Sequence, residues 1–510
     1  MVNTGKPSRG CATCKKRKIK CDQTEPNCTA CLKSGWTCPG IPCETEINFR
    51  NQTPLSIRRS RLSSPVNNIS FTPDTVLAAF SKPGQALSCP LEDVATSFFL
   101  HHYVYQGLDE GLSSQNLFRG SHEYIPALLA APDVTLALKS IVAAAGLAAL
   151  VNAGNSETWR LDAYRLYTRA IRQLRDDLSD PVRKRMDYTL AAVMLMGTFE
   201  VIASGDSQSM KSFGQHSLAA ALCIEMRGRS QFKSKTATRL FMQMRRIIVQ
   251  TCHQMQEPIP YALQRWSSWA ETIQSEDEFY SNRFSEINER LASYRAAIKH
   301  DHITAPSTIS SRLLQFDEEF ESWRRNLPPT WEYKSYRSVH NVNNDFNGVY
   351  DMYPDLWIAS TWNSYRSVRL MLHETIIVAT LQHGSDKEKG GLGYSMSVLE
   401  KMSEEICNSS AYFLGFRRRG TRLCGPIDTG ISSTPGGYML LWPLFFSGML
   451  RTTQGPRRRW VTSVIRRIGM TMGIRLAISM VNILDACEKS FSDKEVWLIG
   501  QFYPQNVKSQ

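Results

Sequence analysis

Cys11 to Cys38 read CATCKKRKIKCDQTEPNCTACLKSGWTC, and the cysteines of this stretch decide how it folds. They form two copies of one repeat, in which two residues separate the first and second cysteines and six separate the second and third. The two repeats are Cys11, Cys14 and Cys21, followed by Cys28, Cys31 and Cys38. Thiolates at such intervals are typical zinc ligands, and a stretch this short cannot bury an adequate core. We therefore expect metal binding to supply its folding energy.

The number of thiolates indicates how many ions they hold. One tetrahedral zinc takes four ligands, so six cysteines overfill a single site, whereas two zinc ions require two of the six thiolates to bridge. The pattern therefore predicts a binuclear cluster with two zinc ions per chain. A disulfide framework is the alternative, but it is typical of secreted chains, and the sequence after Met1 has no apolar signal run.

The first repeat is strongly basic and the second is not. Five of the six residues between Cys14 and Cys21 are cations, whereas the second repeat has Lys33 alone. Residues 1–42 carry eight Lys or Arg against two acids, and this excess falls to about +4 once the charge of six thiolates and two zinc ions is counted. The first repeat is therefore expected to face an anion.

The basic run is expected to contact DNA. A short helix beginning near Cys14 would hold Arg17 and Lys18 close to its outer end, where they can donate to guanine O6 and N7 in the major groove. Such a helix would turn Ile19 inward. The candidate DNA-contacting residues are Lys15, Lys16, Arg17, Lys18 and Lys20. A nuclear import signal is the alternative, and the same lysines could serve as both.

The cysteine spacing, the run KKRKIKC that ends at Cys21, and the residues Asp22 and Pro26 resemble the fungal binuclear zinc cluster transcription factors. The resemblance implies that Cys11 and Cys28 are the bridging ligands. It also implies a nuclear regulator of RNA polymerase II genes, with double-stranded promoter DNA and the transcription machinery as partners.

The same resemblance assigns roles to the cations. Lys18 would read bases, usually in a CGG triplet, and Lys15, Lys16 and Lys20 would mostly hold phosphates. Such proteins often govern a metabolic pathway or a secondary-metabolite gene cluster.

The rest of the chain is typical of a globular protein. Of its 510 residues 42% are hydrophobic, and the net charge of +13 is concentrated in the first 70 residues. Six further cysteines are scattered without ligand spacing and are expected to be reduced core thiols: Cys89, Cys223, Cys252, Cys407, Cys424 and Cys487. These features predict a nuclear or cytosolic protein.

We expect three parts: a zinc cluster domain at residues 1–42, a flexible linker at 43–88 and an all-helical regulatory domain at 89–510. The linker is rich in Ser, Asn, Pro and Thr, and its prolines and irregular apolar spacing exclude a coiled coil. Any homodimer is therefore expected to form through the C-terminal domain.

Helical spacing of apolar residues dominates after the linker. It predicts helices over 94–105, 134–151, 159–178, 186–202, 211–227, 236–255, 285–299, 313–327, 356–381, 395–413 and 459–484. Residues 143–150 (AAAGLAAL), 221–228 and 441–445 resemble the fungal-specific regulatory domain that follows zinc clusters in many such proteins. No apolar run is expected to span a membrane, because 140–151 and 438–450 are short and are interpreted as core helices.

No catalytic constellation is found in the sequence. Phosphate-loop, dinucleotide-binding, nucleophile-elbow and zinc-protease motifs do not occur, and the pairs His101–His102 and His373–Glu374 are interpreted as packed or surface residues. Arg417–Arg419 and Arg457–Arg459 are interpreted as solvated loops. Tyr412, Phe413, Trp442, Phe445 and Phe446 either pack in the core or line an effector pocket.

The sequence thus predicts a zinc-dependent, sequence-specific DNA-binding transcription factor that is not an enzyme. The alternative is a scaffold or enzyme whose zinc module binds nucleic acid without specificity.

Overall fold

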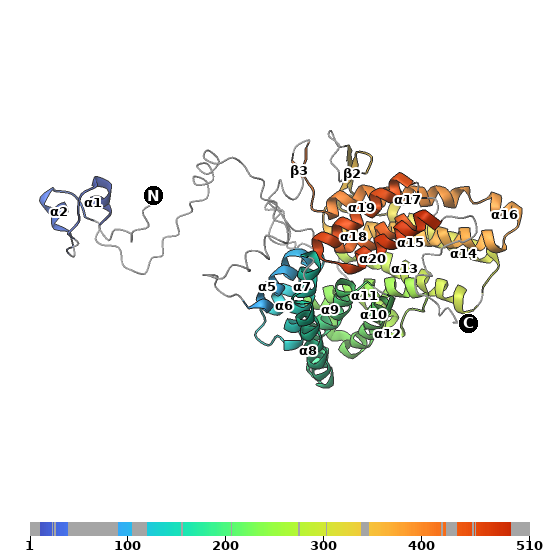
Figure 1. The fold of residues 1–510 in the computed structure, drawn as a ribbon, viewed down its shortest axis with the longest axis horizontal. Helices are drawn as coiled ribbons and strands as arrows, with labels where there is room; N and C mark the ends of the chain where they lie inside the picture. The colour runs from blue at the N-terminus through green and yellow to red at the C-terminus, as the bar shows by residue number, and fades with distance from the viewer. Residues whose placement is uncertain are drawn as a thin grey trace. The chain divides into compact units, whose positions relative to one another are not determined.

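The computed structural model describes residues 11–22, 24, 27–38, 90–104, 120–154, 157–205, 207–273, 276–301, 303–337, 346–419, 422–424, 436–450, 453 and 455–490. The chain divides into two compact units, residues 1–70 and 71–510, called here the N-terminal unit and the helical unit (Figure 1). The expected linker, residues 43–88, lies outside the described residues.

The N-terminal unit holds one short helix in each cysteine repeat: α1 (Ala12–Arg17) and α2 (Thr29–Lys33). Among the described residues of this unit the buried ones are Cys11, Cys14, Cys28 and Cys31, so sulfur takes the place of an apolar core there.

The helical unit confirms the predicted all-α architecture (Figure 1). Its helices are α5 (Leu91–Tyr103), α6 (Ile125–Leu129), α7 (Leu136–Ala153), α8 (Arg160–Ser179), α9 (Asp187–Ala203), α10 (Ser207–Arg227), α11 (Lys235–Met255), α12 (Tyr261–Ile273), α13 (Glu276–His300), α14 (Pro306–Arg325), α15 (Leu356–His383), α16 (Asp386–Gly390), α17 (Gly393–Phe413), α18 (Gly437–Met449), α19 (Gly455–Met472) and α20 (Arg475–Ser490). Short 3-10 turns lie at Arg183–Arg185, Gly228–Phe232 and Pro329–Trp331. One apolar core runs through these helices from α5 to α20.

Two short antiparallel hairpins interrupt the helices. β1 (Lys334–Arg337) pairs with β2 (Val349–Met352), and β3 (Arg417–Arg419) pairs with β4 (Arg422–Cys424). Arg417–Arg419 is therefore a strand and not a loop. Strands of this length are too short to show a clear alternation of apolar and polar residues, so the sequence did not reveal them.

The central helix of the first half is α7, which packs against α5, α8 and α9. The side chain of Thr135 caps it by accepting from the Leu138 amide at 3.5 Å. By length and composition α7 could cross a membrane, contrary to our expectation that no segment is long enough. Since 78% of it is buried within the helical unit, we interpret it as a core helix.

Arg457–Arg459 does not form the expected solvated loop. These residues lie in the first turns of α19, where Arg457 and Arg458 are buried. Arg458 donates to the carbonyls of Gly448 (3.1 Å) and Leu450 (3.0 Å), and so fixes the end of α18. Arg457 donates to Glu400 at 2.6 Å.

His373 is a packed residue, as the sequence indicated. It is fully buried on α15, with Nε2 3.2 Å from an oxygen of Asp317 and Nδ1 3.0 Å from the Ser395 hydroxyl. Asp317 also accepts two hydrogen bonds from Arg369, at 2.6 and 2.9 Å. This buried network joins α14, α15 and α17.

Gly473 divides the single helix predicted over 459–484 into α19 and α20. Its φ of 69° lies in the left-handed region, and the Ile474 amide donates to the Gly469 carbonyl at 2.9 Å, which closes the end of α19. A Cβ at this position would lie 1.9 Å from the carbonyl oxygen of Ala149. The break therefore allows α7 to approach the α19–α20 turn closely.

Gly473→Ala should lower the free energy of unfolding by about 2–5 kcal/mol, because the left-handed conformation and the forced displacement of α7 are both unfavourable. Gly390→Ala is the control, since a Cβ there meets no atom within 4 Å. Urea unfolding followed by circular dichroism measures both, and equal unfolding midpoints would contradict this role of Gly473.

Candidate metal centre and nucleic-acid interface

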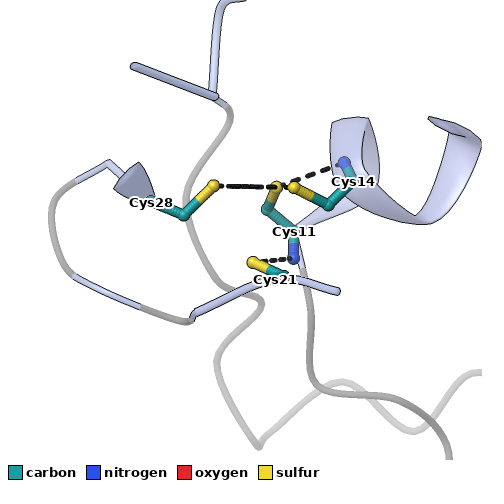
Figure 2. A group of neighbouring side chains, drawn as sticks. All are labelled: Cys11, Cys14, Cys21 and Cys28. Carbon is teal, nitrogen blue, oxygen red and sulfur yellow. Dashed lines mark hydrogen bonds between the residues drawn. The ribbon is translucent and has the colours of Figure 1, made fainter. Parts of the chain in front are cut away.

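The six cysteines form two overlapping groups of sulfur atoms. One group contains Cys11, Cys14, Cys21 and Cys28, and the other contains Cys11, Cys28, Cys31 and Cys38. Within each group the sulfurs lie within 4.8 Å of one another. Figure 2 shows the first group, in which Cys14 projects from α1 and Cys28 comes from the segment before α2. Cys11 and Cys28 are common to both groups.

The sulfur separations fit tetrahedral zinc. A zinc–sulfur bond of about 2.3 Å gives a tetrahedral edge of about 3.8 Å between sulfurs. Within the first group the Sγ atom of Cys28 lies 3.7 Å from those of Cys11 and Cys14, and within the second group the Sγ atom of Cys31 lies 3.8 Å from that of Cys11. The donor set and its spacing are therefore those that zinc requires.

Burial makes the thiols weak acids unless a cation is bound. Removal from water raises the pKa of Cys14, Cys28 and Cys31 to about 12, because the thiolate is disfavoured in an apolar environment. A divalent cation reverses this preference and holds the sulfurs as thiolates. The buried cysteine cluster is therefore suited to hold a divalent cation.

Amide groups repeat the same sulfur contacts in both halves. The Cys11 amide donates to Sγ of Cys21 at 3.4 Å, and the Cys28 amide donates to Sγ of Cys38 at 3.5 Å. Each bond joins the first and third cysteines of its repeat. The repeated sequence therefore gives a repeated backbone, as expected for two halves around one cluster.

The helix ends show the same repetition. The Ile19 amide donates to the Cys14 carbonyl (3.2 Å), and the Trp36 amide donates to the Cys31 carbonyl (3.0 Å). The residue before each donor is left-handed: Gly35 with φ 66° and Lys18 with φ 55°. Glycine adopts this conformation freely, whereas a residue with a Cβ is strained by about 1–2 kcal/mol. Lys18 therefore occupies a position where stability favours glycine.

Asp22 joins the two repeats. Its carboxylate accepts from the Thr29 amide at 3.0 Å and from the Ala30 amide at 3.4 Å, and also from the hydroxyls of Thr24 and Thr29. The hydroxyl of Thr24 is the main cause that lowers the pKa of Asp22, so the group is a carboxylate at neutral pH. A negative group is favoured at the N-terminus of α2.

The candidate DNA contacts are placed differently from one another. Lys16, Lys18 and Lys20 are exposed. Arg17 is half-buried, with its guanidinium carbon 5.1 Å from the centre of the Trp36 ring. The side chain of Lys15 lies outside the described residues, although its backbone belongs to α1.

The short helix expected near Cys14 is α1, which begins at Ala12 and ends at Arg17. One detail of the prediction is wrong. Ile19 is 43% exposed and does not turn inward, because the chain leaves the helix through the left-handed Lys18 before it reaches Ile19.

Comparisons with known proteins agree with this geometry. Residues 9–45 match the fungal Zn(2)-Cys(6) binuclear cluster domain, and residues 98–334 match the fungal specific transcription factor domain. The chain carries the two domains of the fungal zinc cluster transcription factors. Both matches agree with the resemblance that the cysteine spacing and the helical segments indicated, and the first match implies zinc binding by the cluster.

Two fungal regulators are similar to parts of the chain. Sterol uptake control protein 2 of Candida albicans is 36% identical over 80 residues, which are 14% of this chain and 11% of that protein. Transcriptional regulatory protein moc3 of Schizosaccharomyces pombe is 46% identical over 44 residues, 8% of this chain and 9% of that protein. The chain thus spans about a tenth of each relative's length. No solved structure matches the chain.

Trp36 is a residue of the zinc cluster that sequence reasoning missed. Trp36 belongs to the second repeat, and its ring packs against the guanidinium of Arg17 in the first repeat. The Thr13 hydroxyl also joins the two repeats, because it donates to the Thr37 carbonyl at 3.0 Å. Alignment of the two repeats would have paired Lys18 with Gly35, each four residues after the second cysteine of its repeat. That alignment is the signal that could have revealed the unusual conformation of Lys18.

Exchanges at Gly35 and Lys18 should have opposite effects on the cluster. Gly35→Ala should speed zinc release to a chelator, because the left-handed conformation becomes strained by about 1–2 kcal/mol although a Cβ there meets nothing within 4 Å. Lys18→Gly should slow zinc release by removing the same strain. Release can be followed with a colorimetric zinc indicator, and equal rates in the two variants would contradict the assignment.

Proposed function

We propose that this protein is a zinc-dependent transcription factor that binds specific sites in double-stranded DNA through residues 11–38 and regulates RNA polymerase II genes. The observation that carries the proposal is a metal-ligating sulfur cluster with a basic segment, Lys15–Lys20, inserted between two of its cysteines. The matches to the two domains support it, as does the similarity to transcriptional regulatory protein moc3 of Schizosaccharomyces pombe.

The proposed ligands are Cys11, Cys14, Cys21, Cys28, Cys31 and Cys38, which hold two zinc ions. Cys11 and Cys28 bridge the ions, since these two sulfurs belong to both four-sulfur groups. The metals would supply folding energy to the N-terminal unit, which has cysteines where a larger domain has apolar side chains.

Lys18 is the proposed base-reading residue, within a CGG-type half-site. Lys18 keeps a strained left-handed conformation, whereas the equivalent residue of the second repeat is Gly35. Backbone strain that persists in this way supports a functional role for the Lys18 side chain. Its ammonium group can donate to guanine O6 and N7. Lys15, Lys16 and Lys20 then bind phosphates, and Arg17, which packs against Trp36, contacts DNA next to Lys18.

The remaining parts of the proposal concern the whole protein. It acts in the nucleus, contacts the transcription machinery and has no catalytic activity. The helical unit regulates the zinc cluster and forms any homodimer, and the controlled genes belong to a metabolic pathway or a secondary-metabolite cluster. Residues 1–42, 43–88 and 89–510 are the proposed zinc cluster, linker and regulatory domains.

Selection of bound sites from random duplex DNA tests the function. The full chain should enrich sites that contain a CGG-type triplet, and Lys18→Gly should weaken binding to the enriched site by about 1–3 kcal/mol while it leaves binding to random DNA nearly unchanged.

Lys16→Ala is the matched control at a phosphate-binding position. This variant should weaken binding to the enriched site and to random DNA equally. It should also lower the slope of log K against log salt concentration by about one. Failure to enrich any sequence would instead favour a scaffold or enzyme that binds nucleic acid without specificity, and equal effects of the two variants would contradict the division of roles.

A further inference from the structure

The helical unit contains a cavity of about 150 Å³ that is lined mainly by α11, α13, α15 and α18. Its aromatic walls come from Phe213, Phe284, Trp357, Trp442 and Phe446. Trp442 and Phe446 thus line a pocket, whereas Tyr412, Phe413 and Phe445 are buried in the core. The pocket is partly open to solvent, so a small molecule can reach it, and its walls combine aromatic with polar side chains.

The guanidinium of Arg246 lies in the cavity wall without a carboxylate partner. Its carbon is 4.2 Å from the centre of the Trp357 ring, and Nη1 donates to the Ser360 hydroxyl at 2.6 Å. No ion pair of Arg246 within 4.0 Å occurs among the described residues. The carboxylate of Glu123 attracts the Arg246 guanidinium from a greater distance. The ion pair of Glu123 is with Arg239, at 4.0 Å.

Two more polar groups of the lining residues lack partners. Nη2 of Arg245 and Oγ of Ser367 are buried and have no hydrogen-bond partner among the described residues. Both side chains are more than nine-tenths buried. The rest of the Arg245 guanidinium is satisfied, since Nε donates to Glu289 at 2.5 Å and Nη1 to Asn282 at 3.0 Å. The unpartnered polar atoms thus belong to two residues that line the cavity.

The charges around the cavity leave a positive excess. Glu289 compensates Arg245, and Glu123 compensates Arg239, so the charge of Arg246 remains. Burial lowers the pKa of Arg246 to about 10, because the charged form loses hydration, yet the group stays protonated at neutral pH. His253 adds no charge, since burial lowers its pKa to about 3. An anion would relieve the lost hydration.

We propose that this cavity binds a small organic carboxylate whose apolar body is about the size of one ring. Benzene fits an apolar cavity of about 150 Å³, so the volume of this pocket sets the size of the ligand's apolar body at about one ring. A guanidinium recognises a carboxylate through paired hydrogen bonds, and the hydroxyls of Ser360 and Ser367 lie in the same wall. The site belongs to the helical unit and its occupancy does not depend on DNA binding.

Calorimetric titration of the full chain with benzoate and with benzyl alcohol tests the proposal. The two probes are similar in size, but only benzoate carries a charge, so benzoate should bind at least tenfold more tightly and raise the thermal unfolding midpoint. Arg246→Met should remove the preference for benzoate, because methionine keeps much of the side-chain bulk but carries no positive charge. Ser360→Ala should weaken benzoate several-fold while the unfolding midpoint without ligand changes little.

Arg229→Met is the matched control. Arg229 is exposed and its guanidinium carbon lies 4.1 Å from the centre of the Trp269 ring, outside the cavity. Benzoate affinity should be unchanged in this variant. Equal affinity for the two probes, no binding of benzoate at millimolar concentration, or equal loss in the Arg229 and Arg246 variants would overturn the proposal and leave water as the occupant.

Discussion

Two overlapping groups of four sulfurs constrain the described residues of the N-terminal unit. Sharing is possible only when the first cysteines of the two repeats, Cys11 and Cys28, lie side by side, and this brings the two short helices together. The carboxylate of Asp22 then holds the start of α2, and the Thr13 hydroxyl holds the end of the second repeat. A compact unit results although its buried residues are cysteines and not a large set of apolar side chains.

The two repeats differ at the turn that follows each helix. Both leave their helix through a left-handed residue, but the second uses Gly35 and the first uses Lys18. The first repeat thus accepts strain and places a cation at the end of α1, beside Lys16 and the Arg17–Trp36 pair. If the proposed function is correct, the turn after α1 is less stable than it would be with glycine, and the Lys18 side chain at this turn reads DNA.

The sequence predicted features that depend on spacing along the chain. Cysteine intervals indicated the cluster, and apolar periodicity indicated α7, α9, α11 and α15 close to their observed bounds. Prediction from the sequence failed where a contact between residues far apart in the chain determines the local structure. The break at Gly473 depends on the approach of Ala149, and Arg458 is buried because the end of α18 supplies carbonyls. The cavity beside Arg246 likewise needs helices far apart in sequence, and no local pattern marks it.

The count of bound zinc ions tests the shared-sulfur arrangement most directly. Native mass spectrometry of the full chain should find two zinc ions per chain. Cys28→Ala removes a sulfur that belongs to both groups and should release both ions, whereas Cys38→Ala removes one that belongs to a single group and should leave one ion bound. One ion in the unaltered protein, or the same number of ions in the two variants, would contradict the account.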